Sequence, residues 1–66
     1  MHEVTRKIMK IVTVTAHNVV DKGGDFTSVR YNMVKKLTKK YPGLNEGTLL
    51  GGFNHEYATY VAKKVS

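Results

Sequence analysis

The sequence predicts an α+β domain with the element order β-α-β-β, in which one amphipathic helix packs on a short antiparallel sheet. Three observations lead to this prediction: β-branched residues at 11–15, a helical apolar stripe between 26 and 41, and alternating apolar residues after the glycine pair at 51–52. The chain has 66 residues, so we expect a single domain over 1–66.

The first segment, residues 4–20, is expected to form a strand. Its centre is the β-branched run 11–15, which is costly in a helix and suits a pleated surface. Arg6 and Lys10 interrupt the N-terminal half of its apolar face. The equal-parity residues of that face are Val4, Ile8, Val12 and Val14. The spacing of Val4, Ile8 and Ile11 also fits a helix, so the N-terminal end stays open between the two structures.

The second segment is expected to form the helix. Asp25, Thr27 and Ser28 are candidate N-caps, and Pro42-Gly43 ends the helix near Tyr41. Its apolar stripe consists of Phe26, Met33, Leu37 and Tyr41, with Val34 beside it. Its other side carries Lys35, Lys36, Lys39 and Lys40. The last two lysines also suit the negative end of the helix dipole.

The third segment is compatible with two structures. The glycine pair at 51–52 can supply the turn of a hairpin, and apolar residues then alternate as on one face of a strand over 53–65. A helix fits the same residues, because Phe53, Tyr57, Val61 and Val65 are spaced by four and Asn54 can cap them. β-Branched residues and tyrosines favour the strand.

Small size and the predicted sheet both favour self-association. A chain this short buries only ~60% of the surface that its unfolded form exposes. The sequence has no cysteine to supply a disulfide or a Cys-ligated zinc. The small sheet would leave an exposed edge that can pair with another chain. We therefore expect a homodimer as one way to stabilise the domain.

Net charge is the strongest compositional signal. Eleven Lys and Arg residues oppose five Asp and Glu residues, which gives a net charge of +6 and a pI near 9.8. Such an excess favours approach to polyanions, although it also serves solubility. Nine of the eleven are lysines. Lysine contacts phosphate as a point charge, whereas arginine is the better reader of bases, so the balance predicts contacts to a nucleic-acid backbone.

The candidate nucleic-acid-binding residues centre on the helix lysines. These lysines form like-charged pairs at i, i+4, each costing a few tenths of a kcal/mol, and no acidic residue between 26 and 43 offsets them. A bound anion would relieve that cost, and a solvated outer face is the alternative. The basic groups at both chain ends extend the set if they converge on the helix, and a tyrosine beside the lysines can stack on bases. The full set is Tyr31, Lys35, Lys36, Lys39, Lys40, Lys63 and Lys64.

Other motifs favour no catalytic, cofactor or metal site. The glycine loop at 21–25 lacks the Lys-Ser/Thr of a phosphate-binding loop and carries two aspartates, so it is interpreted as a plain turn. His2, His17 and His55 have no partner at metal-ligand spacing within their own segments. A site joining His17 to Glu56 would need both on one face, which the predicted strand does not allow. No cysteine nucleophile and no Ser-His-Asp arrangement is present.

Two classes of function remain, and both are non-enzymatic. The first is a nucleic-acid-binding module that uses the lysine face. The alternative is a small protein-interaction module, such as an inhibitor, a regulatory subunit or a phage-type accessory protein, that uses a sheet edge or the apolar residues 49–53. The apolar run at 11–14 is too short for a signal peptide, and no stretch approaches the ~18 apolar residues of a membrane span. We therefore expect a cytoplasmic protein without a membrane partner.

Overall fold

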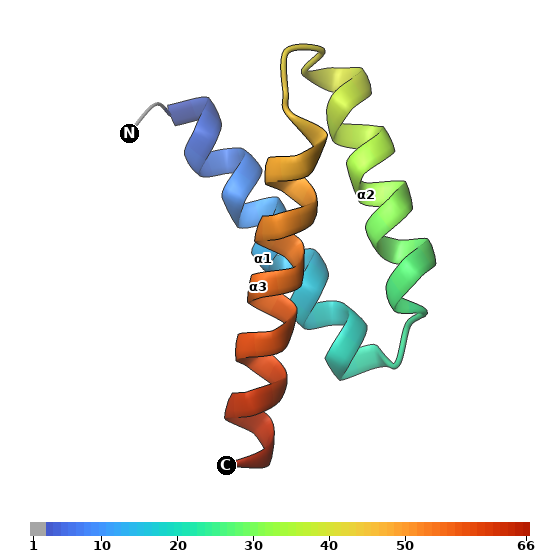
Figure 1. Ribbon diagram of the computed structural model, residues 1–66, viewed down its shortest axis with the longest axis vertical. Helices are drawn as coiled ribbons and strands as arrows, with labels where there is room; N and C mark the ends of the chain where they lie inside the picture. The colour runs from blue at the N-terminus through green and yellow to red at the C-terminus, as the bar shows by residue number, and fades with distance from the viewer. Residues whose placement is uncertain (1–2) are drawn as a thin grey trace.

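The computed structural model describes residues 3–66, which form three helices (Figure 1). Helix α1 spans Glu3–Lys22, α2 spans Phe26–Lys40 and α3 spans Glu46–Val65. Helices α2 and α3 run antiparallel, while α1 passes behind α3 in the view of Figure 1 and crosses it. The largest contact between helices is that of α1 with α3. Residues 3–66 contain no strand, so the predicted β-α-β-β fold is wrong.

Helix α1 occupies the segment that was predicted as a strand. β-Branched residues cost a helix only a few tenths of a kcal/mol each. Burial of an Ile or Val side chain contributes about 1.5–3 kcal/mol, so packing outweighs local propensity here. The buried residues recur at helical spacing, and they are Ile8, Val12, Ala16 and Val19. The exposed Thr15 hydroxyl is satisfied within the helix, where it donates to the Ile11 carbonyl at 2.6 Å.

Helix α3 replaces both the predicted hairpin and the predicted C-terminal strand. Gly51 and Gly52 lie inside the helix, which is capped by Asn45 and not by Asn54. The Asn45 side chain accepts from the Thr48 N–H at 3.1 Å. The four-residue spacing from Phe53 was the correct alternative, because Phe53 is fully buried and Tyr57 packs against the core.

Helix α2 confirms the prediction for the second segment. Asp25 caps it by accepting from the Ser28 N–H at 2.8 Å, and Tyr41 is the C-cap. Met33, Val34 and Leu37 are buried, and the outer members of the predicted stripe, Phe26 and Tyr41, are partly buried against the core.

The core lies where the three helices meet. Its nine buried residues come from every helix: Ile8, Val12, Ala16, Val19, Met33, Val34, Leu37, Leu49 and Phe53. Aromatic rings close it near the start of α2, where the Phe26 ring lies 5.3 Å from that of Phe53 and 4.6 Å from that of Tyr57. Leu49 and Phe53 are 3% and 0% exposed, so the apolar surface expected at 49–53 is core.

The glycine loop between α1 and α2 is the plain turn that the sequence predicts. Gly23 has a φ of 69°, a left-handed conformation that glycine adopts without steric cost. This conformation lets the Gly24 N–H donate to the Val19 carbonyl at 3.1 Å, which closes the end of α1. The loop thereby reverses the chain into α2.

The expected surface for self-association changes with the fold. Residues 3–66 have no sheet edge, so a homodimer cannot form by the strand pairing that was expected. A homodimer stays a prediction that depends on the small size of the chain. No helix within the same range is both long and apolar enough to cross a membrane.

Glycine 51 offers a direct test of the helical assignment. Its added Cβ would meet nothing within 4 Å, so Gly51→Ala should raise the free energy of unfolding by about 0.5–1 kcal/mol through helix propensity alone. Urea unfolding followed by circular dichroism measures this change. Gly47→Ala is the matched control, because its Cβ would press on the Asn45 capping oxygen at 3.0 Å and should gain less. Destabilisation by Gly51→Ala would instead favour the hairpin.

Candidate nucleic-acid interface

The four lysines of α2 are all exposed, but they do not share one surface. Lys36 and Lys40 line a hollow between α1 and α2. Lys35 lines a different hollow between α2 and α3, together with Tyr31 and the acidic Glu46. The helix therefore presents its lysines toward both neighbouring helices, which corrects the expectation of a single lysine side.

Basic residues of α1 join the first of these surfaces. Lys7 and Lys10 line a hollow with Lys40 and Tyr41. This hollow, of about 470 Å³, adjoins the one of about 410 Å³ that contains Lys36, and the two share Ile11. We call the combined surface the basic groove and define it by Lys7, Lys10, Ile11, Val14, Lys36 and Lys40.

The basic groove has cationic rims and an apolar floor. Ile11 and Val14 are 40% and 48% exposed, so the floor presents aliphatic surface to solvent. None of the acidic residues in the described range 3–66 lines the two hollows. The lysine charges in the groove are therefore not offset by a carboxylate of the groove itself.

Four of the five acidic residues have structural roles outside the groove, and the fifth, Glu3, lies one turn before Lys7 at the start of α1. Asp25 caps α2. Its carboxylate accepts a hydrogen bond from the Ser28 N–H, and this bond lowers the pKa of the carboxyl. Asp21 contacts Lys64 and Tyr60, and Glu56 faces His17. Glu46 lies in the first turn of α3, where the helix dipole favours negative charge.

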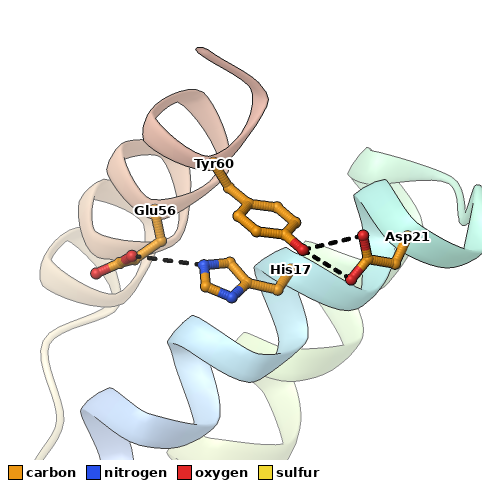
Figure 2. Close-up of polar contacts among 4 residues, drawn as sticks. All are labelled: His17, Asp21, Glu56 and Tyr60. Atoms are coloured by element: carbon orange, nitrogen blue, oxygen red, sulfur yellow. Dashed lines mark hydrogen bonds and ion pairs between the residues drawn. The ribbon is translucent and has the colours of Figure 1, made fainter. Parts of the chain in front are cut away.

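A second group of polar side chains joins α1 to α3 (Figure 2). We call it the polar cluster, and its members are His17, Asp21, Glu56, Tyr60 and Lys64. The Tyr60 hydroxyl donates to the Asp21 carboxylate, with its oxygen 3.0 and 2.9 Å from the two acceptor atoms. The Lys64 Nζ lies 3.1 Å from Asp21 Oδ1. The His17 ring stacks on Tyr60 at 3.9 Å, and its Nε2 is 4.0 Å from Glu56 Oε2.

The polar cluster connects α1 to α3 through side-chain contacts. His17 and Asp21 are one turn apart on α1, and Glu56, Tyr60 and Lys64 follow one another by single turns on α3. The four-residue spacing is visible in the sequence. The strand prediction missed it, because it grouped these segments by the two-residue alternation of a strand. His17 does meet Glu56, contrary to the expectation from the strand. No group of three or more His, Cys, Asp or Glu residues within 3–66 has an arrangement that could hold a metal, and His2 lies outside that range.

The structure separates the C-terminal lysines from the basic groove. Lys64 is paired with Asp21, so its charge is offset locally. Lys63 is exposed in the last turn of α3, and neither residue lines the groove. Of the seven predicted binding residues, the groove brings together only Lys36 and Lys40. Lys39 is exposed on α2 and lines none of these hollows.

Sequence reasoning underrated the contribution of α1. Lys7 and Lys10 entered only as an extension of the lysine face, and Ile11 and Val14 were assigned to a strand. The available signal was the spacing of residues 7, 10, 11 and 14, which places them on one face of a helix.

Comparison with protein-family profiles, with curated proteins and with solved structures found no match for this chain.

The polar cluster should make stability depend on acid pH. Its hydrogen bonds from Lys64 and Tyr60 lower the pKa of Asp21 below the value in the unfolded chain. The folded state thus releases this proton more readily, so the stabilisation is present above the unfolded pKa and is lost as pH falls through the folded pKa. The free energy of unfolding should decline below about pH 4, and Asp21→Asn should flatten that decline.

Urea titrations of both proteins across the acid range measure this effect. A residual decline is expected in Asp21→Asn, because the pKa of Asp25 is also lowered, by its hydrogen bond from Ser28. Identical acid profiles for the two proteins would contradict the role assigned to Asp21.

Proposed function

We propose that this protein is a small non-enzymatic module that binds nucleic acid, chiefly through the phosphate backbone. The observation that supports the proposal most directly is the meeting of Lys7 and Lys10 from α1 with Lys36 and Lys40 from α2 on one surface without a carboxylate. Phosphates are spaced regularly along a nucleic acid, so cations from two helices can contact several of them at once.

Electrostatics gives a reason for a polyanion to bind there. Lys36 and Lys40 are one turn apart on α2 and repel each other by a few tenths of a kcal/mol. A phosphate between them replaces repulsion with attraction and releases condensed counterions from the nucleic acid. Because the groove has lysines and no arginine, it favours contacts to phosphate over readout of base edges.

Reversal of the groove charge should weaken this binding. Lys36→Glu combined with Lys40→Glu should weaken binding to a generic duplex by roughly tenfold or more at low salt, because two attractive contacts become repulsive. Fluorescence anisotropy measures the affinity. For the unchanged protein, contact with four phosphates should give a slope of about −3.6 for the logarithm of the association constant against that of salt.

The matched control reverses two lysines outside the groove. Lys22→Glu combined with Lys63→Glu changes the net charge equally at exposed ends of α1 and α3. It should retain most of the affinity. Equal losses in the two double variants would assign binding to overall charge and not to the groove.

A second candidate function is the capture of an acidic amphipathic helix. The apolar floor at Ile11 and Val14 favours it, because phosphate contacts alone do not require exposed aliphatic side chains. A helix with an apolar face and glutamates on its flanks matches a groove of this composition. A second copy of this chain is a poorer occupant, since its groove would bring lysines against lysines. This candidate keeps the protein-interaction class but moves its surface from residues 49–53 to the basic groove.

A substitution in the apolar floor of the basic groove distinguishes the two candidate functions. Val14→Gln removes apolar surface and leaves every lysine in place, so duplex affinity should change less than twofold. Affinity for a synthetic helix with a leucine face and a glutamate face should fall by roughly tenfold if that side chain packs in the groove. Anisotropy titrations with the peptide and with a scrambled version measure this. A peptide that binds no better than its scrambled form would eliminate the second candidate.

A further inference from the structure

The four tyrosines of the chain fall into two groups. Two of them lie in α3 and contact side chains of the other helices. Tyr57 packs edge-on against Phe26 of α2, and Tyr60 stacks on His17 of α1 and donates to Asp21. The other two belong to α2 and its C-cap, and of these Tyr41 packs against the core. A lysine lies beside the rings of Tyr31, Tyr41 and Tyr60. Tyr31 is the most exposed, at 60% of its surface.

Each tyrosine of the second group combines an aromatic face with a nearby cation. The Lys35 Nζ lies 5.4 Å from the centre of the Tyr31 ring. The Lys40 Nζ lies 5.6 Å from the centre of the Tyr41 ring, and Tyr41 lines the basic groove with Lys7 and Lys10. Both ammonium groups end flexible, exposed side chains, so they can move from the ring to a phosphate while the ring takes a base.

We propose that the protein binds single-stranded nucleic acid in preference to duplex, with a base stacked on Tyr31. The inference rests on the proposed function, since it specifies which form of nucleic acid binds. It assigns the base to a second surface of α2, beside the hollow that Tyr31 and Lys35 line and outside the basic groove. A duplex offers the same phosphates but keeps its base faces stacked within the helix. A single strand presents both groups, and ring–base stacking is tolerant of sequence because every base has an aromatic face.

The arrangement around Tyr31 suits this mode of binding. Lys35 and Lys39 follow Tyr31 by one and two helical turns on the same side of α2, so the cations extend from the ring along about 12 Å of the helix. No acidic residue lies within α2 itself, and the one carboxylate that lines the hollow beside Tyr31 and Lys35 is Glu46 of α3. A strand that places one base on Tyr31 can therefore run its following phosphates past successive lysines.

The test compares a labelled oligothymidylate with a duplex of equal length at one salt concentration. Tyr31→Leu keeps an apolar side chain but removes the aromatic face, and it should weaken single-strand binding about fivefold or more. Duplex binding should change less than twofold. Tyr31→Phe retains the ring and should bind the single strand nearly as well as the unchanged protein.

Circular dichroism is expected to show that both variants fold, since Tyr31 is exposed and outside the core. Equal affinity for the single strand and the duplex would overturn the inference while nucleic-acid binding stands, and so would equal effects of Tyr31→Leu on the two ligands. Failure to bind either ligand would overturn the proposed function together with the inference.

Discussion

The packing of α1 on α3 around Val12 and Phe53 is the constraint on which the rest of the structure depends. Both side chains are fully buried. Gly52 faces the same contact, where a Cβ would lie 3.7 Å from Met9 and from Val12, at an ordinary van der Waals distance. Because one face of α1 packs against α3, only the other faces of α1 are available for contact with α2.

The basic groove is a consequence of this packing of α1 against α3. Helix α2 sends Met33, Val34 and Leu37 into the core between the other two helices. It therefore covers the remaining face of α1 only in part, and Ile11 and Val14 stay substantially exposed. Three helices leave a position that a fourth helix would fill in a larger bundle. The lysines at its rims come from both helices, so the crossing of α1 with α2 determines their convergence.

The carboxylates of the described residues lie outside the lining of the groove, so its lining charges are all positive. Asp21 holds Lys64 and Tyr60 in the polar cluster, and Asp25 caps α2. Glu46 lies in the first turn of α3, and Glu56 of α3 faces His17 of α1. Glu3 lies one turn before Lys7 on α1 and is the acidic residue nearest to the groove in the sequence of that helix. None of these carboxylates lines the groove itself.

The sequence by itself determined α2, its Asp25 cap, its buried stripe and the excess of lysine, because each depends on local spacing or composition. It did not determine the helices over 4–20 and 53–65, since their β-branched residues and repeated spacings fit strand and helix alike. Only tertiary packing decided them, because burial of side chains such as Val12 and Phe53 exceeds the propensity cost. The meeting of Lys7 and Lys10 with Lys36 and Lys40 was likewise a tertiary outcome. Residues some thirty positions apart share a surface through the angle at which two helices pack, and no local pattern encodes that angle.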